Sequence, residues 1–198
     1  MKLKLLLLFG LLSLQGLTQK LYSDTAYKNV KSFVKIEDAI VNPDSVIKLI
    51  LRKQKLTTIP REICSFKNLE YLDLSKNKLD SIPLEITQLK KLKVLLLARN
   101  QIKVVPPEIY LLTDLKILNM SSNDITILPK GIQALSQLEE LDIWNTSVGD
   151  LPNDIEKIKS LRVVDMRGIL LNYERQEELF ELLPDVKLYM SPPCNCSF

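Results

Sequence analysis

The sequence predicts an α/β solenoid, in which short parallel strands form one face and short helical segments form the other. Three observations support this prediction. Leucines recur in a fixed pattern every 23 residues, an asparagine closes the pattern in three successive units, and a proline follows at the same interval. A period of this length is typical of repeat proteins, in which each unit buries its apolar face against its neighbours.

The repeat runs through six units without an insertion. The first apolar position of the units is occupied by Val46, Leu69, Leu92, Leu115, Leu138 and Leu161. Two further columns keep the same spacing, namely the prolines Pro60, Pro83, Pro106, Pro129 and Pro152 and the isoleucines Ile63, Ile86, Ile109, Ile132 and Ile155. Because the units are equal in length, equivalent residues of neighbouring units are expected to lie side by side.

Alternation within each unit predicts a short strand with two different faces. Successive side chains of a strand point to opposite sides, so Leu72 and Leu74 are expected to point inward. Tyr71, Asp73 and Ser75 are then expected to point outward. One strand cannot bury its inner face alone, and stacking the units removes that apolar surface from water at ~25 cal/mol per Å².

Polar and proline positions explain how each coil turns. Asn77, Asn100 and Asn123 follow the strands, where the turning backbone leaves N–H and C=O groups that need partners. An amide side chain both donates and accepts hydrogen bonds, so it suits this structural role. Each proline is expected to start a short helical turn, where its missing N–H is not needed. Acidic residues two positions after the proline suit the positive end of such a turn, namely Glu62, Glu85, Glu108 and Asp154.

These motifs resemble those of the leucine-rich repeat family. LEYLDLSKN (69–77), LKVLLLARN (92–100) and LKILNMSSN (115–123) match LxxLxLxxN, and KLDSIPLEITQL (78–89) matches the continuation xLxxLPxxIxxL. The resemblance covers about residues 46–169, and Gln54, Thr146 and Ile169 depart from the asparagine position near the ends. It implies a leucine-rich-repeat solenoid, or horseshoe, with a parallel concave sheet, short helical or 3-10 convex segments, an asparagine ladder and helical N- and C-terminal caps.

Both ends of a solenoid leave an apolar face uncovered, so a cap is expected at each. Apolar residues recur at roughly helical spacing between Phe33 and Val41, which predicts a short amphipathic helix at about 32–41. At the other end the sequence predicts a helix over 173–184, and VKLYM (186–190) alternates like one more strand. This ending resembles those of small exported bacterial leucine-rich-repeat proteins.

The N-terminus is interpreted as a signal peptide. A basic MKLK segment precedes an uncharged apolar run that is too short to span a bilayer, and the small residues Gly16 and Thr18 precede Gln19. A retained membrane anchor is the alternative. The predicted organisation is a signal peptide at 1–18, an N-terminal segment and capping helix at 19–45, six repeats at 46–169 and a C-terminal cap and tail at 170–198.

Composition argues against several classes of function. The chain has no histidine and only five scattered glycines, so it lacks the commonest general base and a Gly-rich phosphate loop. The 27 basic residues include Lys2 and Lys4 of the signal, so its removal leaves 25 against 24 acidic residues, a balance that argues against a nucleic-acid partner. Asp142 and Asp165 are expected on an open strand surface and not in a catalytic pocket. We therefore predict no catalytic residues, no cofactor and no metal site.

The three cysteines leave a question open. Cys64 occupies a repeat position, where a small buried residue is expected. Cys194 and Cys196 hint at a disulfide or metal tether in the tail. The sequence does not decide whether these two are free, bridged to each other or bonded to another molecule.

Outward strand residues are expected to form columns across the concave sheet, because neighbouring strands lie about 4.8 Å apart. The ligand-binding residues predicted on this face are Tyr71, Asp73, Val94, Leu96, Ile117, Asn119, Glu140, Asp142, Trp144, Asp165 and Arg167. Val94, Leu96 and Ile117 are expected to form an exposed apolar centre between Tyr71 and Trp144. An apolar patch with a polar rim is typical of a protein-binding site, and Trp144 is expected to contribute most.

Charge is distributed unevenly along this face. The early units carry Lys48, Arg52, Lys53, Lys76 and Arg99, and the later units carry Glu140, Asp142 and Asp165. The predicted function is non-catalytic recognition of a protein, or of a surface polymer, by an exported monomer without a membrane span once the signal is removed. A structural envelope component without a ligand is one alternative. The other is an intracellular adaptor, similar to leucine-rich-repeat proteins that bind Ras-like GTPases, which would keep its leader in the cytosol.

Overall fold

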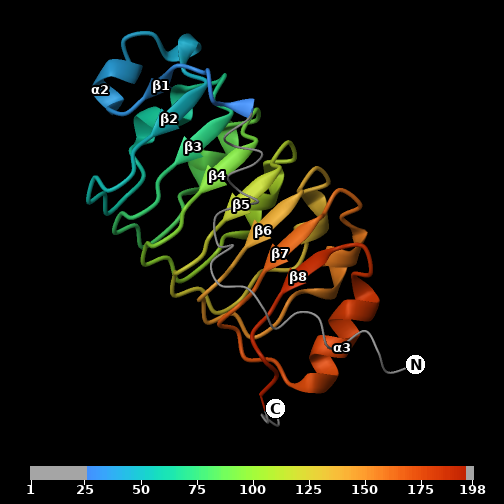
Figure 1. The fold of residues 1–198 in the computed structure, drawn as a ribbon. Coiled ribbons are helices and arrows are strands. Elements are labelled where there is room, and N and C mark those ends of the chain that lie inside the picture. Colours follow the sequence, from blue (N-terminus) through green and yellow to red (C-terminus); the bar gives the residue numbers. More distant parts are fainter. Residues whose placement is uncertain (1–25, 195–198) are drawn as a thin grey trace.

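The computed structural model describes residues 26–194 and shows one parallel sheet with a layer of short turns behind it (Figure 1). Within this part of the chain the sheet has eight strands, which follow one another in chain order. They are β1 (Ser32–Phe33), β2 (Lys48–Ile50), β3 (Tyr71–Asp73), β4 (Val94–Leu96), β5 (Ile117–Asn119), β6 (Glu140–Asp142), β7 (Val163–Asp165) and β8 (Lys187–Tyr189). Helices α2 (Ile36–Ala39) and α3 (Tyr173–Leu182) lie at opposite ends of the sheet.

Strands β2 to β7 pair in a register that equals the sequence repeat. Tyr71 of β3 pairs with Val94 of β4, and Val94 pairs with Ile117 of β5. The step of 23 residues is replaced by 24 at the last pairing, where Val163 of β7 meets Lys187 of β8. Equivalent residues of the repeats therefore do lie side by side, as predicted.

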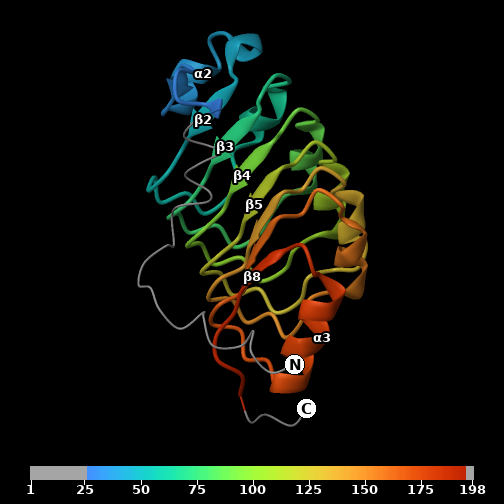
Figure 2. The same ribbon diagram turned by 45° about the vertical axis from the view of Figure 1, so that its right-hand side comes forward.

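Short 3-10 turns form the face behind the sheet (Figure 2). They span Pro43–Ser45, Arg61–Ser65, Leu84–Gln88, Pro107–Leu111, Ile132–Ala134 and Asn153–Lys157. The repeat prolines Pro60, Pro83, Pro106 and Pro152 directly precede four of them, which confirms their predicted role. The turn after Pro129 starts later and is shorter, because Gly131 with φ 98° precedes it.

The core is one continuous apolar cluster between the sheet and the turns, from Phe33 at one end to Leu188 at the other. Leu72, Leu95 and Leu118 of successive strands are fully buried in it. Inward orientation of the repeat leucines is therefore confirmed. This burial supplies most of the stabilisation, because an isolated three-residue strand has no stability of its own.

The asparagine ladder is present. Nδ2 of Asn100 donates to the carbonyl of Leu97 at 2.8 Å and to that of Leu74 in the preceding coil at 3.1 Å. Its Oδ1 accepts a hydrogen bond from the backbone N–H of Leu79 at 3.0 Å. Asn77 and Asn123 make the equivalent contacts within their own coils and with the preceding coils. Each asparagine thus joins two coils through backbone groups that water cannot reach.

The two caps differ in how well the sequence predicts them. The C-terminal helix and the additional strand are confirmed as α3 and β8. The N-terminal prediction of a helix at 32–41 is only partly right, because its first residues form strand β1 and the helix α2 has four residues. Strand β1 pairs with β2 and places Phe33 in the core, so hydrogen bonding to the sheet edge outweighs the helical spacing.

The predicted signal peptide and Cys196 lie outside the described residues. Cys194 is disulfide-bonded, and Cys64 is a buried free thiol as expected from its repeat position. Over residues 26–194 no helix is both long enough and apolar enough to cross a membrane.

Candidate functional site

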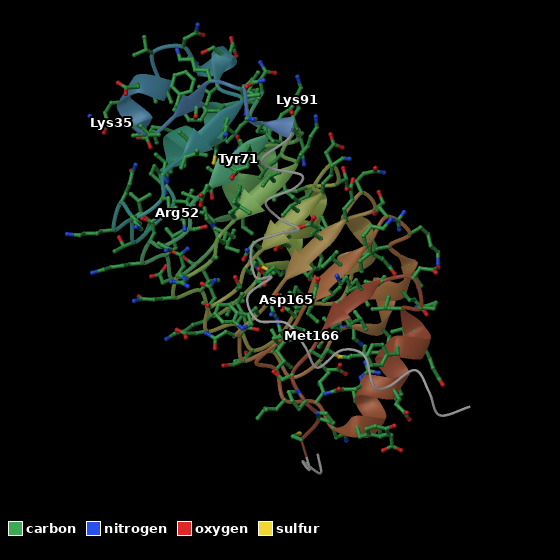
Figure 3. The ribbon with its side chains drawn as sticks, in the orientation of Figure 1. Lys35, Arg52, Tyr71, Lys91, Asp165 and Met166 are labelled. Atoms are coloured by element: carbon green, nitrogen blue, oxygen red, sulfur yellow. The ribbon has the colours of Figure 1, made fainter. Side chains whose placement is uncertain are left out.

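The concave face carries the predicted ligand-binding residues in two columns that the strand register defines. One column contains Lys48, Tyr71, Val94, Ile117, Glu140 and Val163, and the other contains Ile50, Asp73, Leu96, Asn119, Asp142 and Asp165. Trp144 and Arg167 follow β6 and β7, and the carbonyl of each accepts a backbone hydrogen bond from the preceding coil. Figure 3 shows Tyr71 near one end of the sheet and Asp165 towards the other.

The N-terminal half of this face is closed, which corrects one prediction. Val94 and Ile117 are 0% and 1% exposed, and Tyr71 is 8% exposed, so they do not form an exposed apolar centre. They belong to a second apolar cluster on the concave side together with Tyr27, against which Val30, Ile50 and Leu96 pack. The outward faces of the strands β3 to β5 are therefore largely buried.

Tyr27 reaches this cluster because residues 26–30 form a turn over the sheet. Its ring lies 5.4 Å from the ring of Tyr71, and its hydroxyl donates to Oε2 of Glu70 at 3.0 Å. Nζ of Lys48 donates to the Tyr27 carbonyl at 3.0 Å and lies 5.2 Å from the Tyr71 ring centroid. These contacts hold the segment at β3 through apolar, polar and cation–π interactions.

The C-terminal half of the face is more open. Trp144, Asp165 and Arg167 are partly exposed, and so is Tyr189 of β8. The Arg167 guanidinium forms a forked ion pair with the Asp165 carboxylate and lies 5.3 Å from the Tyr189 ring centroid. Aromatic rings beside an ordered charge pair combine apolar contact with directional hydrogen bonding, as at many protein interfaces.

Most polar residues of the second column also support the backbone. One side-chain oxygen of Asp73, Asn119, Asp142 and Asp165 accepts a hydrogen bond from the backbone N–H two residues later. In this way Asp142 fixes the backbone of Trp144 at 3.0 Å. Oδ2 of Asp142 also accepts a hydrogen bond from Asn119 Nδ2 at 2.9 Å. These residues therefore position the aromatic side chain as well as contributing charge.

Two carboxyl groups on the C-terminal half of the face have pKa values above their ordinary range. Burial, followed by the charges of Glu139 and Asp142, raises the pKa of Glu140 to about 7. Burial, aided by the charge of Asp165, raises the pKa of Asp142 to about 6, even though the N–H of Trp144 opposes the shift. Oε2 of Glu140 is buried and has no hydrogen-bond partner among residues 26–194. The negative charge of these carboxyl groups therefore changes with pH near neutrality.

A family model described as a leucine-rich repeat region matches residues 29–187, which is most of the chain. The chain belongs to the leucine-rich repeat family. Among curated proteins, no sequence matches this leucine-rich repeat protein significantly.

Solved structures with the same fold come from bacteria and plants. A leucine-rich repeat protein of Leptospira interrogans is 24% identical with a TM-score of 0.53, and the alignment covers 81% of this chain and 58% of that one. The ectodomain of the receptor kinase SOBIR1 from Arabidopsis thaliana is 28% identical with a TM-score of 0.55, over 74% of each chain. The Arabidopsis ectodomain of GASSHO1/SCHENGEN3, in complex with CASPARIAN STRIP INTEGRITY FACTOR 2, is 23% identical over 73% of this chain and 17% of that chain, with a TM-score of 0.54.

Sequence reasoning missed two residues of the concave face in this leucine-rich repeat protein. Tyr27 lies before the repeats, and its only local signal is an apolar pair with Val30 around a Lys28–Asn29 turn. Tyr189 lies on the predicted last strand, but the step of 24 residues to β8 breaks the period that places the other columns. Both residues required the tertiary structure before their neighbours could be assigned.

Proposed function

We propose that this leucine-rich repeat protein is a non-catalytic binding module that recognises another protein through the C-terminal half of its concave face. The contact residues are Trp144, Asp165, Arg167 and Tyr189, with Glu140 and Asp142 beside them. The observation that carries the proposal is the partly exposed Trp144 on an otherwise polar, acidic surface. Tryptophan and tyrosine contribute strongly to binding energy where a partner excludes water from them.

The chemistry of this surface indicates the kind of partner. This half of the face carries the carboxyl groups of Glu140, Asp142 and Asp165. Its cations are Arg167, which pairs with Asp165, and Lys187, whose Nζ lies 4.8 Å from the Tyr189 ring centroid. A protein segment with an apolar side chain flanked by lysine or arginine would complement it. One of the similar ectodomains binds CASPARIAN STRIP INTEGRITY FACTOR 2, which supports ligand binding as a use of this fold.

The first experiment compares three immobilised proteins for capture of partners from the native host, followed by titration of each captured protein. The variant Trp144→Ala removes the proposed anchor, and Val104→Ser changes an exposed apolar residue outside the concave sheet. We expect saturable binding by the wild type and Val104→Ser, and at least about tenfold weaker binding by Trp144→Ala. Equal affinity for all three would place the site elsewhere, and lack of any saturable partner would favour the structural alternative.

We also propose that the protein is exported after removal of residues 1–18. The apolar leader supports this, and sequencing the N-terminus of the protein from fractionated host cells tests it. We expect a start at Gln19 outside the cytosol. An intact Met1 in the cytosolic fraction would instead favour the intracellular adaptor.

A further inference from the structure

One backbone position has a left-handed conformation in every repeat. It is the residue before the ladder asparagine or its equivalent, and its φ is 61° at Lys53, 59° at Lys76, 58° at Arg99, 53° at Ser122, 54° at Asn145 and 86° at Gly168. The six residues are 23 apart in sequence, so they form a column along the edge of the sheet where the strands end. Each coil turns away from the sheet at this column.

The residue types in this column differ between the two halves of the molecule. Left-handed backbone suits glycine and is tolerated by asparagine, and these occupy the last two coils as Asn145 and Gly168. The first three coils have Lys53, Lys76 and Arg99 there, although long side chains are unfavourable at positive φ. Folding alone therefore does not favour these three cations. Strained backbone of this kind is often found where a side chain has a functional role.

The three cations are part of a larger group that we call the basic edge. It consists of Arg52, Lys53, Lys55, Lys76, Lys78, Arg99 and Lys103, which all lie within a few residues of this column in the first three coils. Figure 3 shows nitrogen-tipped side chains extending from this edge near Arg52. Among the described residues none of the seven takes part in an ion pair.

The geometry keeps these charges close together. The backbone N–H of Lys53 donates to Ser75 O at 3.1 Å and that of Lys76 donates to Ala98 O at 2.8 Å, so the coils are fixed at the strand spacing of about 4.8 Å. The charges of Arg52 and Arg99, followed by partial burial and the charge of Lys53, lower the pKa of Lys76. The charge of Asp73 opposes this shift, so repulsion within the row is only partly offset in the free protein.

We propose that the basic edge binds a linear polymer bearing sulfate or phosphate groups, which lies across the first three coils. The cations form a line and do not converge on a point, so they match a chain of anions better than one compact ion. Five of the seven are lysines, whose charge imposes no fixed hydrogen-bonding geometry and tolerates an irregular polymer. Binding would relieve the repulsion and release counterions from both partners.

Other polyanionic surfaces fit less well. The segments 52–57, 75–80 and 98–103 contain no aromatic residue on which nucleic-acid bases could stack. In the same described segments no large apolar side chain is exposed, although such residues strengthen binding at a membrane interface. A sulfated or phosphorylated polymer needs only the charges that are present.

The test is a triple variant chosen to keep the fold, with the Tm as the check on folding. Lys53→Asn, Lys76→Asn and Arg99→Asn together remove three charges and place a residue that tolerates positive φ at each position. We expect a Tm equal to or above that of the wild type. Affinity for heparin fragments and for inorganic polyphosphate, measured by titration at about 50 mM salt, should fall at least about tenfold, with a weaker salt dependence.

The matched control removes three exposed lysines elsewhere, with Lys90→Asn, Lys130→Asn and Lys157→Asn. We expect it to lose at most about twofold in affinity, because charges more than about 14 Å from the bound polymer are largely screened at this salt concentration. An equal loss in both triple variants would overturn the proposal, since binding would then follow net charge. Absence of polymer binding by the wild type would also overturn it. The same holds if the wild type binds single-stranded DNA or phosphatidylserine vesicles as tightly as it binds heparin fragments or polyphosphate. Affinity for the polymers that is unchanged in Trp144→Ala would show that the basic edge acts separately from the concave face.

Discussion

Glu140 lies in an environment that disfavours its charge. The strand β6 places its carboxyl on the concave side, where Glu139 and Asp142 are neighbours and Oε2 lacks a hydrogen bond among residues 26–194. Its pKa in the folded protein, about 7, is above its ordinary value of 4.5, so the folded state binds a proton more tightly than the unfolded state. Stability from this residue is present at low pH and is lost as the pH rises from about 4.5 to about 7.

The variant Glu140→Gln removes this dependence. At pH 8 we expect its free energy of unfolding to exceed that of the wild type by roughly 1–2 kcal/mol, because a neutral amide replaces a buried carboxylate. At pH 4 the two proteins should have similar stability. Urea denaturation at pH 4, 6 and 8 measures the difference, with Glu181→Gln on the exposed side of α3 as the control. A difference that is the same at all three pH values would contradict the assignment.

At the scale of elements, the C-terminal cap depends on one face of α3. The Asn172 side chain accepts a hydrogen bond from the Arg175 N–H at 2.8 Å, which fixes the start of the helix. Leu179 is fully buried against the last coil, whereas its neighbour Phe180 is 45% exposed. The helix therefore covers the apolar end of the solenoid through residues on a single side.

Replacing Leu179 and Phe180 by alanine, one at a time, separates the contribution of packing against the core from the change in helix propensity. We expect Leu179→Ala to lower the free energy of unfolding by about 3 kcal/mol, because it leaves a cavity between α3 and the core. Phe180→Ala should cost less than about 1 kcal/mol, although it removes a larger side chain. Chemical denaturation monitored by circular dichroism measures both. A larger loss for Phe180→Ala would show that the exposed face of α3 is covered in solution.

At the scale of the whole molecule, the uniform period makes each coil an equivalent unit. The ladder asparagines and the repeat leucines contact mainly the coils on either side, so a coil is stabilised by its neighbours. Removal of residues 92–114 would join Lys91 to Leu115 and bring equivalent positions of the remaining coils together. The core would then be shorter but continuous.

We expect the protein lacking 92–114 to fold cooperatively with a lower Tm, because one interface between coils is lost. The protein lacking 92–113 should have a lower Tm than the protein lacking 92–114. Its one surplus residue must be accommodated in a turn to keep the leucines inward, as in the 24-residue step between β7 and β8. Thermal denaturation followed by circular dichroism compares them. Equal behaviour of the two deletions would show that register does not determine stability here.

The sequence by itself determined the solenoid, the register of strands β2 to β7, the inward leucines, the asparagine ladder and the C-terminal helix. These follow from a period that every unit repeats, so local chemistry and long-range packing give the same answer. The predicted columns were correct, and the site assigned to them is still a proposal. Their chemistry could be read from the sequence, but not their exposure.

The tertiary structure alone decided which part of the concave face is open. Tyr27 lies outside the periodic region, yet it packs with Tyr71, Val94 and Ile117. The tertiary structure also revealed the contact of Tyr189 with Arg167 and the column of left-handed residues that carries the basic edge. Exposure depends on every segment that can fold back over a surface, whereas a repeat pattern describes only the contacts between its own units.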